Sequence, residues 1–267
     1  MLEKIKTMDC IEYMKEMESE SVDLVMTSPP YAMRRGSSYG GTDYDKYPEW
    51  MYSVGEEIYR VLKPTGSFVL NIADTVEKGC RNLYVFKTVE LLTTLFRWSD
   101  TYIWVKTNPF PTGSNKRLKN GFEYCFWFTK TNKYKFFPNE VLVPSTNKFL
   151  DREKKRKNKG AHPCINGSGM NMSKRYVSDM VRPSNVIMLP TDTTNHEHPA
   201  SFPLALPTFF IKLMTEHGDT VFDPFMGGGT TLLAAKNEGR YWMGCDKVDK
   251  YVRIAKRRLS EITLFEV

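Results

Sequence analysis

A glycine-rich segment near the C-terminus of the 267-residue chain has the composition of a ligand-binding turn. It contains Asp-Pro-Phe-Met-Gly-Gly-Gly-Thr-Thr at residues 223–231, between a short apolar run and a helical pattern. Glycines let a backbone approach a ligand closely, and open α/β sheets bind nucleotides at turns of this kind. Asp246 ends the next expected strand, where such folds place an acid that accepts hydrogen bonds from ribose hydroxyls. Together the two features predict a nucleotide-like ligand.

The same segment argues against a ligand with a pyrophosphate. Neither G-x-G-x-x-G nor G-x-x-x-x-G-K-[ST] is intact in the chain, and these are the motifs whose backbone binds such a group. An adenosine cofactor without a diphosphate fits better, and S-adenosylmethionine meets that description. The alternative is a turn that only packs tightly, which leaves the acid at ribose spacing unexplained.

A second constellation is Thr-Ser-Pro-Pro-Tyr at residues 27–31, directly after the apolar run at 22–26. Two adjacent prolines cannot continue a paired central strand, so the strand must stop there. The simplest interpretation is a strand-ending turn. However, the prolines also stiffen a backbone with free carbonyls, a hydroxyl precedes them, and an aromatic ring follows. Such an arrangement can hold a planar base that carries an amino group.

Both motifs resemble those of the amino-methyltransferases that modify exocyclic nitrogens in DNA. Their order in the chain is that of the circularly permuted beta group of this family, and the resemblance covers about residues 1–130 and 186–260. Gly228 departs from the family, which commonly has Ser there. The resemblance implies a Rossmann-like, doubly wound α/β methyltransferase sheet, circularly permuted, with an inserted basic target-recognition region. It also implies S-adenosylmethionine as the cofactor and S-adenosylhomocysteine as its product.

The resemblance assigns roles to the matched residues. Ser28, Pro29, Pro30 and Tyr31 form the catalytic tetrapeptide, in which the Ser28 side chain and the Pro29 carbonyl accept the amine hydrogens and the Tyr31 ring stacks on the base. The residues expected to bind the cofactor are Asp9, Phe202, Pro203, Asp223, Pro224, Phe225, Gly227, Gly229, Thr230, Thr231 and Asp246. Residues 7–10 resemble the family's cofactor-adenine segment, and residues 198–203 resemble the segment that closes over the methionine part.

The first residue of the tetrapeptide bears on the choice of base. In the family, Ser at this position goes mainly with N4-cytosine and Asp mainly with N6-adenine. Ser28 therefore favours methyl transfer to the N4 amine of cytosine in duplex DNA, after the base is flipped out of the helix. Transfer to N6 of adenine is the alternative within the family. A non-catalytic DNA-binding protein with the same fold is the alternative outside it. A cognate restriction endonuclease that acts on the same site is a candidate partner.

The positive charge of the chain, +7 at neutral pH, is concentrated in its centre. Residues 106–185 hold 17 Lys and Arg against 5 Asp and Glu. This block predicts phosphate contacts with double-stranded DNA. The residues expected to make them are Lys106, Lys116, Arg117 and Lys119. The lysine-rich run at 154–159 is also consistent with an ordinary solvated charge run.

Three further residues could take part in chemistry. Cys164 follows a proline, as the attacking cysteine of ring-carbon cytosine methyltransferases does, but it lies in a polar basic segment, so we interpret it as non-catalytic. Asp74 closes an expected strand and could equally line the active site or cap the next element. Glu123 is a lone acid on an expected strand, for which a structural role is favoured.

Short apolar strands alternate with helical patterns on both flanks of the basic block. Strands are expected at residues 22–26, 67–72, 101–105, 220–222 and 241–245, and helices at 50–62, 83–96, 202–217 and 230–237. This alternation predicts a largely parallel, doubly wound sheet. We divide the chain into a catalytic half at 1–106, a target-recognition region at 107–190 and a cofactor-binding half at 191–267.

Composition excludes several other classes of protein. With 41% hydrophobic and 26% charged residues, the chain is globular rather than disordered. It has no apolar run of the roughly 18–20 residues that span a bilayer, and no signal-peptide core, so we expect a cytoplasmic protein. The five cysteines are scattered without a C-x-x-C pair, and the histidines lack suitably spaced partners. Neither a disulfide framework nor a metal site is expected.

Overall fold

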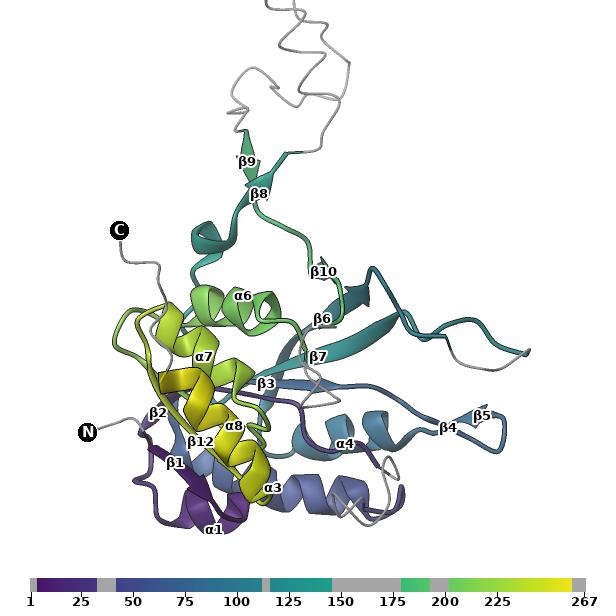
Figure 1. Cartoon of the computed structure of the whole chain (residues 1–267), viewed down its shortest axis with the longest axis horizontal. Coiled ribbons are helices and arrows are strands. Elements are labelled where there is room, and N and C mark those ends of the chain that lie inside the picture. The colour runs from purple at the N-terminus through teal and green to yellow at the C-terminus, as the bar shows by residue number, and fades with distance from the viewer. Residues whose placement is uncertain (1–3, 33–41, 112–115, 146–178, 193–201, 261–267) are drawn as a thin grey trace, which may run out of the picture. The chain divides into compact units, whose positions relative to one another are not determined.

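The computed structural model describes residues 4–32, 42–111, 116–145, 179–192 and 202–260. Its main element is an eight-stranded sheet with the strand order β1-β12-β11-β2-β3-β7-β6-β10 (Figure 1). The strands are β1 (Lys4–Thr7), β2 (Val22–Thr27), β3 (Leu62–Ile72), β6 (Arg97–Lys106), β7 (Phe122–Thr129), β10 (Val186–Leu189), β11 (Thr220–Asp223) and β12 (Tyr241–Asp246). All are parallel except β7, which pairs antiparallel with β3 and β6.

Two groups of helices cover the sheet. The helices are α1 (Cys10–Lys15), α3 (Tyr47–Val61), α4 (Tyr84–Leu92), α6 (Ala205–Met214), α7 (Thr230–Asn237) and α8 (Asp249–Ser260). Phe126 and Phe128 of β7 join the core formed with α1, α3 and α4. Trp127 between them approaches Tyr102, which contacts Phe210 of α6. Because successive strand residues point to opposite faces, α6 lies on the other face from α3 and α4.

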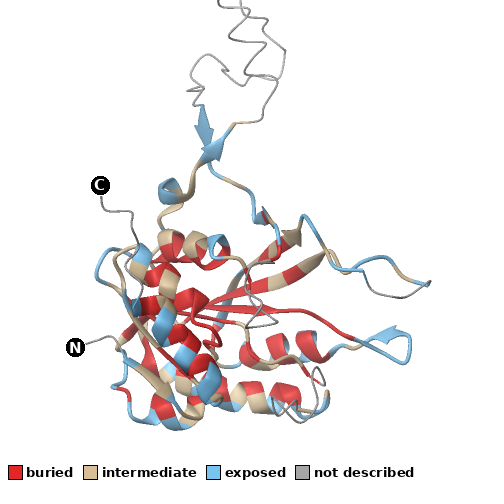
Figure 2. Cartoon of the chain, viewed as in Figure 1, coloured by how far each residue is buried: buried red, intermediate tan, exposed pale blue. Residues whose placement is uncertain are grey.

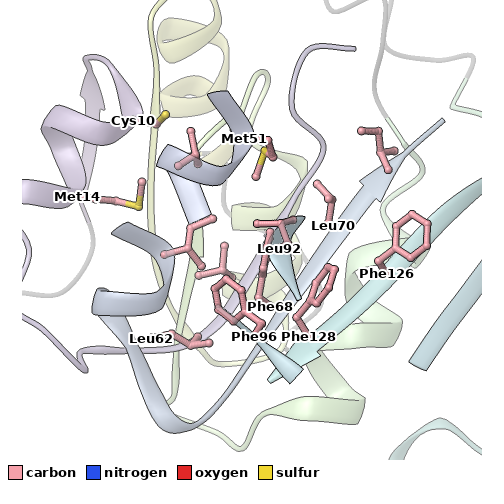
Figure 3. Close-up of a cluster of buried hydrophobic side chains, with 14 of the residues drawn as sticks. Cys10, Met14, Met51, Leu62, Phe68, Leu70, Leu92, Phe96, Phe126 and Phe128 are labelled. Carbon is pink, nitrogen blue, oxygen red and sulfur yellow. The ribbon is translucent and has the colours of Figure 1, made fainter. Parts of the chain in front are cut away.

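The core beneath α1, α3 and α4 is built from large side chains (Figure 3). The Phe68 ring lies 5.5 Å from that of Phe96 and 5.6 Å from that of Phe128, centroid to centroid. Met14 of α1 and Met51 of α3 are fully buried in the same cluster. Burying each such side chain stabilises the fold by roughly 1.5–3 kcal/mol. Figure 2 shows that the central strands are almost entirely buried, so their ends are held in fixed positions.

The sheet changes its direction of growth between β2 and β11. From β2 the chain adds β3 on one side, and from β11 it adds β12 on the other side. Loops that leave such a switch point diverge, and ligands of open α/β sheets bind in the crevice between them. The strands β1, β12, β11, β2, β3 and β6 all end at this edge, and the antiparallel β7 begins there. The prediction of a largely parallel, doubly wound α/β sheet is confirmed.

The chain divides into two compact units, residues 1–137 with 184–267 and residues 138–183. In the second unit, η1 (Pro138–Val141) precedes β8 (Val143–Pro144), which pairs antiparallel with β9 (Met180–Val181). The recognition region expected at 107–190 is wider than this unit and includes β7 and β10 of the central sheet. Its boundaries and its role stay predictions. The basic run at 154–159 and Cys164 lie outside the described residues.

One further feature of the main unit is a short hairpin, β4 (Val76–Glu77) and β5 (Cys80–Arg81), inserted between β3 and α4. In the ranges that the structure covers, no helix is both long enough and apolar enough to cross a membrane.

Candidate active site

The tetrapeptide at residues 28–31 leaves the sheet at the end of β2. The strand is buried along its whole length, and Thr27 is its last residue. Pro29 is buried, while Ser28, Pro30 and Tyr31 are half-buried. The strand ends where the two prolines require it to end, so the motif lies at the carboxyl edge of the sheet beside the switch point.

Asp223, at the end of the neighbouring strand β11, joins this motif to the glycine-rich turn. One carboxylate oxygen accepts hydrogen bonds from Thr27 Oγ1 at 2.6 Å and from the Phe225 amide at 3.0 Å. The other accepts from Thr231 Oγ1 at 2.7 Å. Burial raises the pKa of Asp223 to about 6, although the hydroxyls of Thr27 and Thr231 favour the ionised form. Asp223 is therefore an internal anchor for the turn.

The glycine-rich turn adopts a conformation that depends on its glycines. Gly227 and Gly229 have φ of +50° and +77°, in the left-handed region that other residues rarely adopt. A Cβ on Gly229 would lie 2.8 Å from the Cβ of Ala255 in α8. The predicted residues Pro224, Phe225, Thr230 and Thr231 follow in the turn and the first turn of α7, where all but Phe225 are buried.

Arg258 of α8 holds the same turn from outside. Its guanidinium donates to the Gly228 carbonyl at 2.6 Å and to Thr230 Oγ1 at 3.1 Å. The carbonyl that it binds belongs to the position where this chain departs from the family pattern. The start of α7 is therefore held by Asp223 on one side and by Arg258 on the other.

Asp246 lies at the end of β12, as predicted. Its carboxylate accepts from the Gly227 amide at 3.1 Å and from the Val248 amide at 2.8 Å. Burial raises its pKa, and the two amides partly offset that effect. A carboxylate has about four acceptor positions, so these bonds leave Asp246 with capacity to accept from a ligand hydroxyl.

Asp9 lies one strand further along, after β1. It caps α1 by accepting from the amides of Ile11 and Glu12, and it forms a 2.7 Å ion pair with Lys247. Burial alone would raise the pKa of Asp9, but Lys247 and the helix amides outweigh the effect of burial, so the pKa is lowered. The Met8 amide donates to the Asp246 carbonyl, which brings the Asp9 segment alongside the expected ribose-binding residue.

Phe202 and Pro203 precede α6. Phe202 is buried, and the Pro203 carbonyl accepts from the Leu206 amide in the first turn of the helix. Helix α6 packs against α7, which places the two residues on the same side of the sheet as the helix that begins in the glycine-rich turn. The rest of the resembling segment, residues 198–201, belongs to a stretch that the structure does not describe.

Glu123 and Lys106 lie beside the tetrapeptide. The Tyr31 hydroxyl donates to Glu123 Oε2 at 2.7 Å, and Lys106 Nζ forms a 2.6 Å ion pair with Glu123 Oε1. Ser28 Oγ lies 3.4 Å from the Tyr31 hydroxyl. Glu123 is the second residue of β7 and Lys106 is the last residue of β6, and these strands are paired. Glu123, the lone acid of the sequence analysis, is thus in direct contact with the tetrapeptide, and Lys106 is paired with Glu123.

Asp74, for which the sequence left two roles open, is buried just after β3 and accepts a hydrogen bond from Arg81 of β5. The contact ties the β4–β5 hairpin to the edge of the sheet that carries the tetrapeptide. An ion pair of this kind is consistent with a structural role, and it also keeps a carboxylate at the site.

The other predicted DNA contacts lie between β6 and β7. Lys116 and Lys119 are exposed and Arg117 is half-buried, in a segment that leaves the sheet at the same edge as the tetrapeptide. Leu118 and Phe110 of the same segment are exposed as well. The segment presents positive charge and apolar surface together, beside the site.

Four residues of the site were not predicted as site residues: Thr27, Lys247, Arg258 and Glu123, for which a structural role was favoured. Thr27 was visible as the residue before the tetrapeptide, and Lys247 as the residue after Asp246. Arg258 gave no signal, because a basic residue on a basic helix is ordinary. Metal ligands do not gather anywhere in the described part of the chain: no group of three or more His, Cys, Asp or Glu side chains could hold an ion.

Comparisons with known proteins agree with this geometry. A family model described as DNA methylase matches residues 22–257. The type II methyltransferase M.PvuII of Proteus hauseri is 30% identical, over 97% of this chain and 84% of its own length. M.BglII of Bacillus subtilis is 31% identical, over 97% and 69%.

Solved structures are similar along the whole chain. The PvuII DNA methyltransferase (cytosine-N4-specific) has a TM-score of 0.75 and 26% identity, covering 99% of this chain and 88% of that one. The M1.HpyAVI–SAM complex shares the fold, with a TM-score of 0.62 and 23% identity over 97% and 99% of the two chains. Since the family model spans most of the sequence and includes both strands that meet at the switch point, this chain belongs to the DNA methylase family.

Proposed function

We propose that this enzyme transfers a methyl group from S-adenosylmethionine to the exocyclic N4 amine of cytosine in duplex DNA. The observation that carries the proposal is the Thr27–Asp223 hydrogen bond, which joins the tetrapeptide to the glycine-rich turn at one point of the sheet. The identity of Ser28 and the similarity to a methyltransferase named as cytosine-N4-specific support cytosine as the base.

The residues present fit S-adenosylmethionine. Asp246 retains acceptor capacity for ribose hydroxyls, and Asp9, which the resemblance assigns to the adenine-binding segment, lies next to it. The glycine-rich turn, between Asp223 and α7, provides close backbone approach, and Phe202 and Pro203 would close over the methionine part. When bound, the cofactor supplies an electrophilic methyl group on a sulfonium. S-adenosylmethionine has no diphosphate group, so it does not need the pyrophosphate-binding motifs that this sequence lacks.

The chemistry required of the protein is mainly orientation. The cytosine amine is a poor nucleophile because its lone pair is delocalised into the ring. Acceptors at Ser28 Oγ and the Pro29 carbonyl would hold the amine hydrogens so that the lone pair turns toward the methyl group. The Tyr31 ring would stack on the flipped base, at a contact strength of about 1–3 kcal/mol. Extrusion of the base costs a few kcal/mol, which phosphate contacts of the basic residues would offset.

We assign the recognition of the target site to the region at 107–190. Its basic composition and the long segments that it adds after β6 and after β7 support this role. The relatives M.PvuII and M.BglII are named type II methyltransferases. By that similarity, we propose a cognate restriction endonuclease acting on the same site as a partner.

The direct test is transfer of labelled methyl groups from S-adenosylmethionine to duplex DNA, followed by digestion to nucleosides and mass spectrometry. N4-methylcytosine is the expected product. N6-methyladenine would overturn the base assignment, and 5-methylcytosine would overturn both the base atom and the mechanism. Ser28→Ala and Tyr31→Ala should abolish most transfer and leave cofactor affinity near that of the wild type, because both residues hold the base rather than the methyl donor.

A further inference from the structure

Two side chains of the tetrapeptide, Ser28 and Tyr31, form a hydrogen-bond chain of fixed direction with Glu123 and Lys106. Glu123 is 7% exposed, and its two carboxylate oxygens are bonded to Tyr31 and to Lys106. A carboxylate that is paired with a lysine has no proton to give. Burial and the neighbouring Glu123 raise the pKa of the Tyr31 hydroxyl, which therefore keeps its proton at neutral pH. Tyr31 must be the donor and Glu123 the acceptor.

The direction of the Tyr31–Glu123 hydrogen bond also determines the direction of the bond between Ser28 and Tyr31. The Ser28 hydroxyl lies 3.4 Å from the Tyr31 oxygen, and either atom could donate on geometry alone. The single proton of Tyr31 already points to Glu123, so Ser28 is the donor of this pair. The bond is long, as catalytic hydrogen bonds often are before the substrate binds. With its proton directed toward Tyr31, Ser28 Oγ presents lone pairs on its remaining side.

We propose that Glu123, held by Lys106, is a positioning residue that sets the direction of this chain and so makes Ser28 an acceptor for the target amine. The proposal rests on the proposed function, in which Ser28 holds the exocyclic amine of the base. An amine has hydrogens to donate, so an acceptor at Ser28 binds it and a donor repels it. Lys106 then acts through Glu123 rather than as a phosphate contact.

The placement of the pair supports a function beyond packing. Glu123 faces the same side of the sheet as Trp127, since alternate residues of β7 share a face, and Trp104 lies opposite it on β6. Lys106 follows Trp104 on that face and lies 5.2 Å from its ring centroid. Buried ion pairs are often no more stabilising than apolar pairs of the same volume. Stability alone therefore does not explain a charged pair at the carboxyl edge beside Tyr31.

The key variant is Glu123→Gln. Glutamine has nearly the same shape, but its amide group can donate to the Tyr31 oxygen, which turns the Tyr31 proton toward Ser28 and the Ser28 proton toward the base. We expect kcat for DNA methylation to fall at least tenfold, with the Kd for S-adenosylmethionine within twofold of the wild type. Tyr31→Phe should cause a similar loss. The double variant should be no worse than the more impaired single variant, because both changes break one chain.

Asp23→Asn is the matched control. Asp23 is also a buried carboxylate paired with a lysine, Lys63 at 2.7 Å, but it lies near the start of β2, at the opposite edge of the sheet. The Asp23→Asn substitution should lower the melting temperature. When the assay is run well below that temperature, kcat should be the same as in the wild type. The proposal is overturned if the kcat of Glu123→Gln stays within twofold of the wild type, or if the losses of the two single variants multiply in the double variant. It is also overturned if Asp23→Asn lowers kcat as much as Glu123→Gln does when the two variants lose the same melting temperature.

The product made by the wild type separates this proposal from the proposed function. If the wild type forms N4-methylcytosine and Glu123→Gln matches its kcat, only the role of Glu123 is wrong. If the wild type transfers no methyl group to DNA, the proposed function is wrong and the role of Glu123 is overturned with it. If the product is N6-methyladenine, the substrate is still an amine, and the kcat of Glu123→Gln decides on the role of Glu123.

Discussion

Thr27 and Asp223, 196 residues apart in the chain, are joined by a buried 2.6 Å hydrogen bond from the threonine hydroxyl to the carboxylate. Thr27 is the last residue of the strand that leads into the tetrapeptide, and Asp223 is the last residue of the strand that leads into the glycine-rich turn. The bond crosses the switch point of the sheet. It therefore fixes the distance between the residues expected to hold the base and those expected to hold the methyl donor.

Valine at position 27 should affect the holding of the base more than the holding of the methyl donor. Thr27→Val keeps the β-branched shape of the strand residue but removes the donor, leaving a buried carboxylate with one hydrogen bond fewer. The expected cost is about 1–3 kcal/mol of unfolding free energy. Because the tetrapeptide follows directly, we expect kcat to fall more than cofactor affinity, as measured by steady-state methylation and calorimetric titration of S-adenosylmethionine.

Thr231→Val provides the comparison, since Thr231 donates to the same carboxylate from helix α7. It should destabilise the fold by a similar amount and weaken cofactor binding more than it lowers kcat. Equal effects of the two valines on both parameters would contradict the view that Asp223 connects two distinct sites.

The raised pKa of Asp223 should appear in the pH dependence of stability. Its pKa rises from 3.8 to about 6 on folding, so between these values the folded state holds a proton that the unfolded state has released. Stability must then fall as the pH rises through this window and level off above it. The full effect of a shift of this size is on the order of 2–3 kcal/mol.

Asp223→Asn removes this titration and keeps most of the shape. Chemical unfolding of both proteins between pH 4 and pH 7 should show that the stability of the wild type, relative to the variant, decreases with rising pH. A difference that is independent of pH over this range would show that the carboxyl pKa is not raised.

Much of the fold is predictable because it depends on local patterns. The helix expected at 230–237 and the strand at 220–222 agree with α7 and β11 to within a residue. The helix expected at 202–217 is shorter in the structure, Ala205–Met214. Strand β1 carries little signal, because a strand of four residues at the edge of a sheet, none of them buried, needs no strong alternation. The antiparallel insertion of β7 between β3 and β6 is set by long-range pairing, which no local pattern encodes.

The site is predictable where a motif carries the chemistry and unpredictable where only folding brings residues together. Asp246 and the glycine-rich turn lie together as the spacing predicts, and the amide of Gly227 donates to Asp246. Glu123 is 92 residues from Tyr31 in sequence, and as a single acid on a strand it showed no pattern that distinguishes a functional residue from a structural one. Arg258 reaches the turn only because α8 packs against α7.

Alanine at position 229 should show how tightly the turn is packed. Gly229→Ala places a Cβ in the left-handed region, which costs roughly 1–2 kcal/mol, and 2.8 Å from the Ala255 side chain. Gly218→Ala imposes the same conformational cost, at φ +82°, with no atom within 4 Å. In urea unfolding we expect the unfolding free energy of Gly229→Ala to fall about 1–3 kcal/mol further than that of Gly218→Ala, which is the scale of overpacking. We also expect Gly229→Ala to weaken cofactor binding. Equal losses would mean that α8 yields freely at this contact.

Arg258 should be a determinant of cofactor affinity, although it is expected to touch neither substrate. Arg258→Met keeps the length of the apolar stem and removes both hydrogen bonds to the turn, each worth about 0.5–1.5 kcal/mol. We expect a several-fold higher Kd for S-adenosylmethionine and little change in kcat at saturating cofactor. Arg253→Met, on the exposed side of the same helix, is the control, and a matching rise in Kd there would point to net charge rather than to the turn.

Neutralising the basic residues between β6 and β7 should reduce the salt dependence of DNA binding. A triple variant, Lys116→Gln with Arg117→Gln and Lys119→Gln, removes three charges from a segment that leaves the sheet at the same edge as the tetrapeptide. Each lost phosphate contact reduces the magnitude of the negative slope of log K against log salt by about 0.9. We therefore expect the slope to become less negative by about 2–3, measured by fluorescence anisotropy on a labelled duplex.

Lys133→Gln is the matched control for this effect. Lys133 is exposed and follows the end of β7, which places it at the opposite edge of the sheet. Its replacement should leave the slope unchanged if binding depends on where the charge lies. A similar slope change per charge at both edges would indicate that DNA responds only to the net charge of +7. An unchanged slope in the triple variant would place the phosphate contacts elsewhere. Because phosphate contacts carry no base information, the triple variant should bind all sequences more weakly and keep the target site that the wild type methylates.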